Sequence, residues 1–471
     1  MTATAVPAPA RGARPALALA VLALAHFTVS VDFNVVYIAL PEIGRALGFS
    51  QNSLPWVVNA FALGFGGFLL LGGRAADRLG ARRVLVLGAV LMGAASVVGA
   101  LAAHPAVLVA ARAAQGLGAA ALFPATLALV NTVFAAGPDR NRALAVWGTA
   151  GAFGALAGGA VGGILTSAFG WSAVFWVLVP LTLVTVLAAP RVLPADGRTR
   201  GAGGFDVLGG VLVTAGALLL VFGVFRAQDA GWLALESTGA VALGAAVLGV
   251  LAAVERRTAD PLLPPRLLTH RALVVTTALI LVLMGIVNTL HYVYTSHVQD
   301  VLGLSPLVAG LGFLPQGAAA MAGSMLLLPP LLNRWGVRAA LFTGTLGVGA
   351  TALVFAAGVA WGSYWALLPA VVLLGITAGT TYPAVFAAAG AGVGRGEQGV
   401  SSAMVSTAQQ IGGALGLAAL VAVANAGGTG DGTATAEGLA TASWVGGAVT
   451  IAAAFLALAL RRPRAEESAR S

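Results

Sequence analysis

The sequence predicts an all-α polytopic membrane protein with 14 transmembrane helices. Its 471 residues are 59% hydrophobic and only 9% charged, whereas a soluble domain carries roughly 25% charged residues. Long stretches contain no charged residue, and the arginines gather in alternate loops between the apolar stretches. These three observations exclude an ordinary soluble enzyme, a disordered chain and a DNA-binding protein. The absence of cysteine also excludes disulfides and thiolate metal sites.

Two charge-free stretches set the scale of the predicted helices. One has 48 residues, between Arg142 and Arg191, and the other has 56 residues. A helix needs about 20 apolar residues to cross the hydrocarbon core, so each stretch fits two spans and a tight turn such as Phe169–Trp171. Dividing the whole chain in this way gives spans at 15–40, 53–73, 84–103, 105–134, 143–168, 171–190, 206–225, 233–254, 272–298, 305–330, 339–359, 364–389, 399–424 and 440–460.

The arginines support this division, because cytoplasmic loops carry an excess of Lys and Arg. With the N-terminus in the cytoplasm, 22 of the 25 arginines lie in cytoplasmic segments, while Arg45 and Arg226 lie outside and Arg112 lies within a span. A wrong number of spans would disturb this alternation. The pattern therefore predicts a multi-pass membrane protein with both termini cytoplasmic.

The first span is interpreted as a helix that stays in the protein. Arginines precede it, as in a signal peptide, but the run from Pro15 to Leu40 is longer than the 7–15 apolar residues of such a peptide.

The loops divide the spans into six, two and six. The longest predicted cytoplasmic loops, 191–205 and 255–271, bracket a pair of spans that are poor in polar groups. We therefore expect an N-terminal six-helix bundle at 1–190, an inserted helix hairpin with flanking loops at 191–271, and a C-terminal six-helix bundle with a cytoplasmic tail at 272–471. Two such halves with a path between them are the architecture of many secondary transporters.

A repeated loop supports this division. The loop after the second span reads GRAADRLGARR, and the loop after the tenth span reads LNRWGVR. Asn333 and Gly336 of the second loop stand where Asp77 and Gly80 stand in the first. The alternative is that short loops with glycine and arginine are simply common in membrane proteins.

The first of these loops resembles the signature loop of the major facilitator superfamily, Gly-x-Leu-x-Asp-Arg-x-Gly-Arg-Arg/Lys, except at Ala75 and Ala81. With fourteen predicted spans, the chain resembles the fourteen-helix drug/proton antiporter branch of that family, the multidrug efflux type. The resemblance implies a place in the bacterial cytoplasmic (inner) membrane. The sequence DFNVVYIALP from Asp32 is similar to the first-helix motif of the branch, and RAAQGLGAA from Arg112 is similar to its fourth-helix motif. The fifth-helix motif departs from the family, because Gly159 replaces a proline.

Asp32 and Arg112 are the two formally charged residues away from the ends of the predicted spans. A charge at mid-bilayer costs at least about 2.5–3.5 kcal/mol, and such residues usually face a bundle interior or a wet cavity. Burial favours a neutral carboxyl and a nearby cation favours a charged one, so Asp32 is suited to bind and release a proton. The resemblance also implies proton coupling at both positions. The alternative is a structural ion pair.

Other polar residues in the spans are candidates for substrate binding, conformational gating or proton transfer. Histidine titrates near pH 6.5, so His291 is a second candidate for proton coupling, with a purely structural role as the alternative. The glycines at 154, 158 and 162 allow close helix packing, either static or as a surface on which the halves rock. Candidates for the substrate cavity are His26, Asn34, Tyr37, Asn59, Gln115, Asn131, Asn288, Tyr292, Gln316, Tyr382 and Gln409. Candidates for gating are Gly73, Asp77, Arg78, Gly80, Arg82, Arg83, Gly154, Gly158 and Gly162.

These features predict a proton-coupled secondary active exporter, a drug/H+ antiporter of hydrophobic or amphipathic small molecules that works by alternating access. The alternative is a proton-coupled transporter of one specific metabolite, such as a self-made antibiotic or a nutrient. The sequence has no nucleotide-binding loop, no gathered acid/base groups of a membrane enzyme and no repeated filter residues of a channel. We expect a monomer in the lipid bilayer that binds no nucleic acid and no cofactor or metal, with the proton gradient as its energy source.

Overall fold

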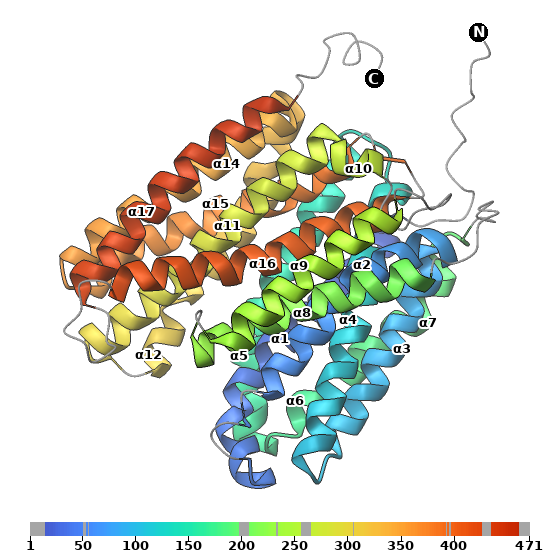
Figure 1. Ribbon diagram of the computed structural model, residues 1–471, viewed down its shortest axis with the longest axis horizontal. Coiled ribbons are helices and arrows are strands. Elements are labelled where there is room, and N and C mark those ends of the chain that lie inside the picture. Colours follow the sequence, from blue (N-terminus) through green and yellow to red (C-terminus); the bar gives the residue numbers. More distant parts are fainter. Residues whose placement is uncertain are drawn as a thin grey trace.

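The computed structural model describes residues 15–49, 53–54, 56–196, 207–231, 234–255, 265–304, 306–391, 393–394, 397–425 and 435–460. Every regular element in these ranges is helical, as Figure 1 shows. The helices are α1 (Pro15–Leu47), α2 (Trp56–Leu79), α3 (Ala81–Ala100), α4 (Pro105–Val133), α5 (Pro138–Phe169), α6 (Ala173–Trp176), α7 (Leu178–Val192), α8 (Val207–Ala230), α9 (Leu235–Glu255), α10 (Pro265–Thr269), α11 (Arg271–Ser296), η1 (His297–Val301), α12 (Pro306–Leu311), α13 (Leu314–Ala322), η2 (Gly323–Leu327), α14 (Leu328–Ala360), α15 (Tyr364–Gly390), α16 (Gln398–Asn425), α17 (Ala436–Ala454) and η4 (Phe455–Ala459).

Among the described residues, twelve helical stretches are long and apolar enough to cross a membrane. The predicted seventh span lies in α8, which has 24 residues; the part of it that the structure describes in full, Gly209–Leu220, is an apolar helix. The predicted tenth and eleventh spans lie together in one stretch of 53 residues, Val308–Ala360. The all-α class and the membrane-spanning character predicted from the sequence are confirmed.

The predicted tenth span, 305–330, is not one continuous α-helix. The chain forms α12, α13 and the π-helix η2 there before α14 begins at Leu328. Pro315 lies in the first turn of α13. Backbone N–H groups in a first turn have no partner within the helix, so the missing N–H of proline costs no hydrogen bond there, and its fixed φ favours the start of a new helix.

The repeated loops share an unusual backbone conformation. Gly80, between α2 and α3, has φ 102°, and Gly336, where α14 is interrupted, has φ 76° and ψ 172°. This region of φ and ψ is essentially restricted to glycine. Gly80 and Gly336, which occupy equivalent positions in the two repeated loops, therefore both have a positive φ.

The helices pack in two groups. Helices α1 to α7 pack on one another, mainly α2 on α4, α1 on α5 and α3 on α4. In the second group α11 packs on α16, and α14 packs on α15 and α17. Helices α8 and α9 form a pair, and α8 contacts α2 of the first group and α16 of the second. In Figure 1 the two groups meet along α2 and α16 and diverge toward α6 and α12.

The three glycines of α5 lie within the first group. A Cβ on Gly154, Gly158 or Gly162 would lie within 2.9 Å of a backbone oxygen of α1. These glycines let α1 and α5 pack closely and do not lie where the two groups meet. The geometry corrects the interpretation of this stripe as a surface on which the halves rock, and it supports static packing.

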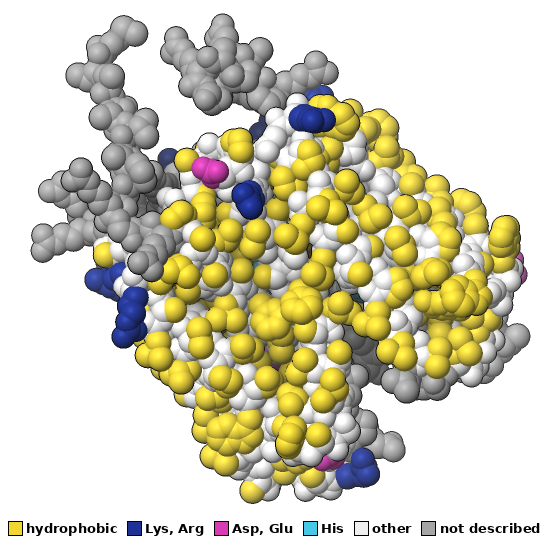
Figure 2. Space-filling view, turned by 180° about the vertical axis from the view of Figure 1, so that it is seen from behind, with side chains coloured by type: hydrophobic (Ala, Val, Ile, Leu, Met, Phe, Trp, Pro, Cys, Tyr) yellow, Lys and Arg dark blue, Asp and Glu magenta, His cyan; other side chains and the backbone are white. Residues whose placement is uncertain are grey.

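The two ends of the molecule differ in charge. The face where α2 ends and α3 begins, here called the arginine-rich face, carries Arg74, Arg78, Arg82, Arg83, Arg140, Arg142, Arg191, Arg266, Arg271, Arg334 and Arg338. Among the described residues, Arg45 and Arg226 lie toward the opposite face. Figure 2 shows hydrophobic side chains spread over the middle of the molecule and arginines at its margins. This distribution matches an apolar belt in contact with lipid tails.

The conformation of Gly336 predicts that adding a single methyl group at this position lowers the stability of the protein. Gly336→Ala should lower the free energy of unfolding by about 1–3 kcal/mol, because its φ and ψ are strained for any other residue. The matched control is Gly159→Ala in α5, where an added Cβ meets open space and alanine favours the helix by about 0.5–1 kcal/mol. Thermal unfolding of the detergent-solubilised protein measures both. Equal midpoints for the two variants would contradict the prediction.

Candidate functional site

A cavity of about 750 Å³ lies between the two groups of helices. This volume is in the range of sites that enclose drug-sized molecules. Its walls come from α1, α2, α4, α5, α11, α15 and α16. Leu54, which precedes α2, also lines it, so the cavity reaches toward the face opposite the arginines.

Seven of the predicted cavity residues line this cavity: His26, Asn34, Tyr37, Asn59, Asn288, Tyr382 and Gln409. The prediction missed other lining residues, including Ser30, Phe33, Phe65, Phe123, Ser406 and Gln410. Helical spacing was a usable signal for some of them. On α1 the lining side chains recur every three or four residues, which places Ser30 and Phe33 on the same side of the helix as the predicted His26, Asn34 and Tyr37.

Four predicted cavity residues lie elsewhere, which corrects the prediction. The buried Gln115 binds Arg112 and Ser96. Asn131 lies beside Gln398 in a separate small crevice nearer the arginine-rich face. Gln316 is within hydrogen-bond distance of His291, with 2.8 Å between their Nε2 atoms. Tyr292 packs against the hydrophobic core. Each of these four side chains contacts other residues of the protein and does not line the cavity.

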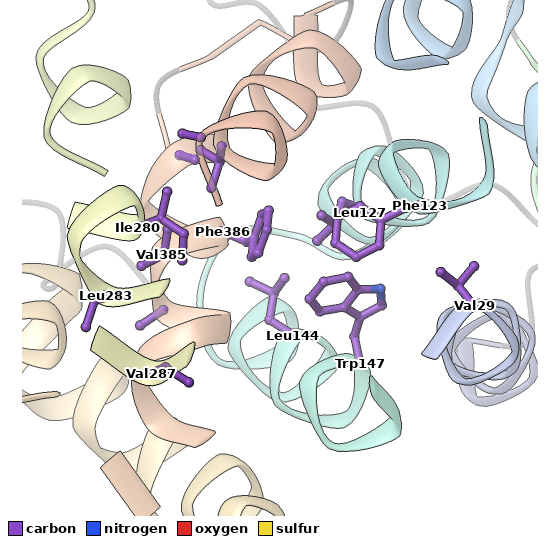
Figure 3. Close-up of a cluster of buried hydrophobic side chains, with 14 of the residues drawn as sticks. Val29, Phe123, Leu127, Leu144, Trp147, Ile280, Leu283, Val287, Val385 and Phe386 are labelled. Atoms are coloured by element: carbon purple, nitrogen blue, oxygen red, sulfur yellow. The ribbon is translucent and has the colours of Figure 1, made fainter. Parts of the chain in front are cut away.

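Aromatic side chains form the floor of the cavity toward the arginine-rich face. The ring of His26 stacks on that of Trp147 at a centroid distance of 3.8 Å, and its Nδ1 lies 2.9 Å from the Trp147 carbonyl oxygen. Phe123 and Phe386 contact Trp147 edge-on. Figure 3 shows Trp147 and Phe386 approaching each other from α5 and α15, so the floor joins the two groups of helices. Aromatic contacts of this kind add about 0.5–1.5 kcal/mol each beyond the burial of their area.

Asp32 and Arg112 form an ion pair inside the first group of helices. Arg112 Nη1 lies 2.5 Å from Asp32 Oδ1, and the side chains are 1% and 0% exposed. The guanidinium also donates to the Val57 carbonyl oxygen at 2.9 Å and to Gln115 Oε1 at 2.9 Å. Gln115 in turn donates to Ser96. The network ties α1, α2, α3 and α4 together.

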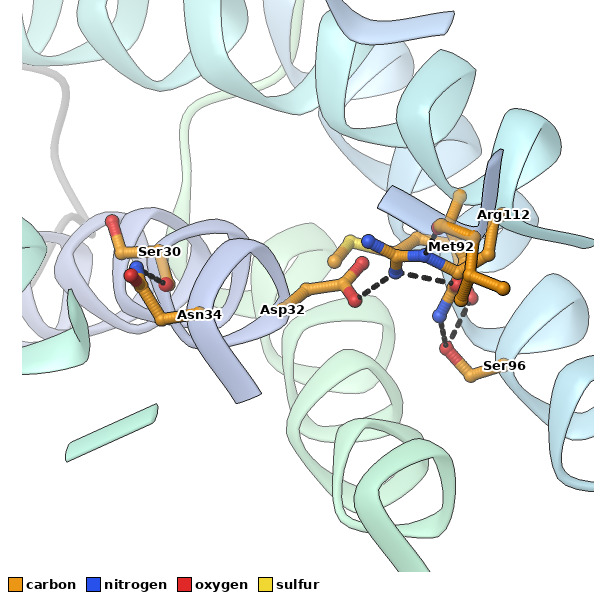
Figure 4. A network of polar contacts seen from close by, with 8 residues as sticks. Ser30, Asp32, Asn34, Met92, Ser96 and Arg112 are labelled. Atoms are coloured by element: carbon orange, nitrogen blue, oxygen red, sulfur yellow. Dashed lines mark hydrogen bonds and ion pairs between the residues drawn. The ribbon is translucent and has the colours of Figure 1, made fainter. Parts of the chain in front are cut away.

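The ion pair does not line the cavity. Figure 4 shows Asp32 directed to one side of α1, toward Arg112, while Ser30 and Asn34 lie on the other side. The Arg112 guanidinium lies 4.4 Å from the centre of the Phe61 ring, and Phe61 packs edge-on against Phe33, which faces the cavity. The expected position inside a bundle is therefore observed, and direct contact between Asp32 and a ligand in this cavity is excluded in this conformation.

The candidate gating residues of the signature loop lie at the closed, arginine-rich face. Asp77, near the end of α2, accepts hydrogen bonds from the backbone N–H groups of Gly399 and Val400 at 2.8 and 2.9 Å. These N–H groups belong to the first turn of α16, where a carboxylate is favoured by the helix dipole. Gly73 lies so close to α16 that a Cβ would come within 2.3 Å of the Gly399 oxygen. The contact closes the end of the cavity on this face.

The rest of the signature loop lies within the first group of helices. Asp196, in the segment after α7, accepts the backbone N–H groups of Arg82 and Arg83 at 2.9 and 3.0 Å. A Cβ on Gly80 would collide with the same carboxyl group. Arg78 lies in the last turn of α2. Asp196 was not predicted from the sequence, because its role depends on a contact between residues 114 positions apart.

A second contact between the groups lies at the same face. Asn141, at the start of α5, donates to Asn333 Oδ1 of α14 at 2.6 Å. Among the residues that the structure describes, no three His, Asp or Glu side chains come together where they could hold a metal ion.

Comparison with known proteins identifies the family. The sequence model of the Major Facilitator Superfamily matches residues 22–417. The chain is 39% identical over 416 residues to the puromycin resistance protein pur8 of Streptomyces alboniger, covering 85% of this chain and 80% of that protein. It is 35% identical over 470 residues to the cephamycin export protein CmcT of Amycolatopsis lactamdurans, covering 96% and 93%. The fold is similar to that of the human organic anion transporter MFSD10 (TETRAN), with a TM-score of 0.69 at 16% identity over 94% of this chain and 99% of that one. The chain therefore belongs to the Major Facilitator Superfamily of membrane transporters.

Proposed function

We propose that this transporter exports hydrophobic or amphipathic small molecules in exchange for protons, by alternating access. The observation that carries the proposal is the cavity between two groups of helices, open toward one face and closed at the other. The similar proteins named for puromycin resistance and cephamycin export support the direction and the kind of substrate. As a member of this family, the chain is a transporter and not an enzyme.

The proposed topology has fourteen crossings with both ends in the cytoplasm, as a monomer in the bacterial inner membrane. Two features support the number. Helix α8 has the length of a crossing, and Gly336 divides the 53-residue stretch into two parts. The proposed units are 1–190, 191–271 and 272–471. The packing of α8 on both α2 and α16 supports a separate hairpin between the halves.

The proposed proton carrier is Asp32, with Arg112 as its partner. Asp32 Oδ2 is buried and has no hydrogen-bond partner among the described residues, so it is the oxygen that would receive the proton. A proton entering the cell releases about 2.3 kcal/mol per 100 mV of membrane potential, so proton entry would drive transport without a cofactor. His291 is a second proposed proton site, although Gln316 binds it and it does not line the cavity.

The proposed gate is the contact of Asp77 and Gly73 with the start of α16. Breaking it would let the two groups separate at the arginine-rich face. The aromatic floor, which joins Trp147 to Phe386 and Tyr382, would part in the same movement.

The central test is transport by purified protein in liposomes with an imposed pH gradient. A panel of hydrophobic and amphipathic compounds should include some whose addition triggers proton movement. Exchange in the presence of a gradient would support antiport and identify a substrate. Equilibration of a compound across the membrane that does not depend on the pH gradient would contradict proton coupling.

The position of Asp32 predicts that proton coupling and substrate binding can be separated. Asp32→Asn should abolish proton-driven transport, because the amide cannot bind and release a proton. It should change the Kd of a transported compound by less than about threefold, because Asp32 lies on the side of α1 away from the cavity. Transport in liposomes and binding to the purified protein measure the two effects.

Asn34→Leu is the matched control for Asp32→Asn. It changes a residue two positions away that faces the cavity, so it should weaken binding and leave the pH dependence of the remaining transport intact. Wild-type pH dependence in Asp32→Asn would remove Asp32 from the mechanism.

The contact between Asp77 and α16 predicts a shift in conformation. The chain has no natural cysteine, so cysteines at positions 141 and 333 report closure at the arginine-rich face by cross-linking. Asp77→Asn loses the charge at the start of α16 and should weaken closure by about 1.5 kcal/mol, or about tenfold in the ratio of closed to open molecules.

Asp196→Asn is the control for Asp77→Asn. It removes the same charge from the start of α3, within one group of helices, and should leave cross-linking unchanged. An equal loss of cross-linking in both variants would show that Asp77 has no particular role in closure.

A further inference from the structure

The cavity wall has no formal charge. Among the described residues, none that lines it is Asp, Glu, Lys or Arg. The nearest buried carboxylate, Asp32, points to the other side of α1 and is paired with Arg112. A cation that entered this cavity would lose its water without gaining a carboxylate partner, and such desolvation is unfavourable.

The floor of the cavity offers aromatic surface. His26, Phe65, Phe123 and Tyr382 line it from four different helices. Phe65 contacts Phe123 edge-on at 5.9 Å, and His26 contacts Phe123 edge-on at 5.3 Å. Behind them, the ring of Trp147 is parallel to that of Tyr382 within 1°. The rings brace one another, so the floor is a rigid aromatic surface on which a planar ligand ring can pack.

The walls above the floor offer unpaired carboxamides. Asn59 on α2, Asn288 on α11 and Gln410 on α16 line the cavity. No described residue forms a hydrogen bond with any of their side chains. A carboxamide donates and accepts hydrogen bonds without carrying charge. These groups therefore suit the hydroxyl, carbonyl and amide groups of an uncharged ligand.

We infer that the cavity binds an uncharged molecule with a planar aromatic ring system and several hydroxyl, carbonyl or amide groups. The ring lies on the floor of His26, Phe123 and Tyr382. The polar groups bind Asn59 from one group of helices and Asn288 and Gln410 from the other. A ligand that makes all of these contacts bridges the two groups. This inference rests on the proposed function and adds the chemical class of the substrate.

Binding of two matched probes tests the inference. The probes are the N-acetyl and the N,N,N-trimethylammonium derivatives of 1-(2-aminoethylamino)anthraquinone, which share a ring and a linker but differ in charge. Binding to the purified full-length protein in lipid nanodiscs is followed by fluorescence, without a pH gradient. The uncharged derivative should bind at least tenfold more tightly than the cationic one.

One substitution should reverse this preference. Asn288→Asp keeps the shape of the side chain and adds a carboxylate to the wall, so it should shift the ratio of affinities at least tenfold toward the cation. Gln410→Glu adds a carboxylate to the wall from α16, and this variant is used if Asn288→Asp does not fold. Ser167→Asp is the control, because it adds a carboxylate at an exposed position outside the cavity and should leave the ratio unchanged.

The outcomes separate this inference from the proposed function. Equal or tighter binding of the cation by the unmodified protein overturns the inference, while export of other compounds in liposomes would still support the function. Binding of neither probe by a protein that exports other compounds also overturns it. Selective binding of the uncharged probe without transport of any compound would support the inferred ligand class and contradict the exporter.

Discussion

The buried ion pair of Asp32 and Arg112 determines how the first group of helices is arranged. A buried pair is tolerated only when the remaining polar atoms are largely satisfied, and removing one partner typically costs 3–5 kcal/mol. Here the guanidinium binds Val57, Gln115 and Asp32, and it lies over Phe61. These contacts set the rotation of α1. Two residues correspond to about 200° around a helix, so Ser30 and Asn34 must face away from Arg112 and into the cavity.

Helix α2 connects this ion pair to the closed face. Near its start, the Val57 carbonyl accepts a hydrogen bond from Arg112, and near its end Asp77 binds the start of α16. Between them, Asn59 and Phe65 line the cavity. One helix therefore contacts the proposed proton site, the ligand cavity and the proposed gate. Because close-packed interiors transmit strain, α2 is a route by which a change at one of these places could affect the others.

The fold was largely predictable because hydropathy and arginine placement respond directly to lipid and water. The division of polar residues between cavity and interior was less predictable, because it depends on helix rotation and on partners far along the chain. Gln115 and Asn59 both carry carboxamides within predicted spans, yet Gln115 accepts a hydrogen bond from Arg112 and Asn59 faces the cavity. The partner of Gln316 lies on another helix, and the glycines of α5 face α1. No spacing within one helix reveals such partners, whereas the spacing on α1 would have placed Ser30 and Phe33 correctly.

If Asp32 carries the proton as proposed, its separation from the cavity constrains how proton and substrate can be exchanged. They do not compete for the same atoms in this conformation, since Phe33 and Phe61 lie between the cavity and Arg112. A proton on Asp32 would leave the Arg112 guanidinium buried without its counter-charge, which is costly. The cost is relieved if α1, α2 and α4 shift so that Arg112 gains other partners or water. Because the same α2 holds Asp77 against α16, this shift would reach the closed face, and coupling would run through helix packing instead of through direct displacement of one ligand by the other.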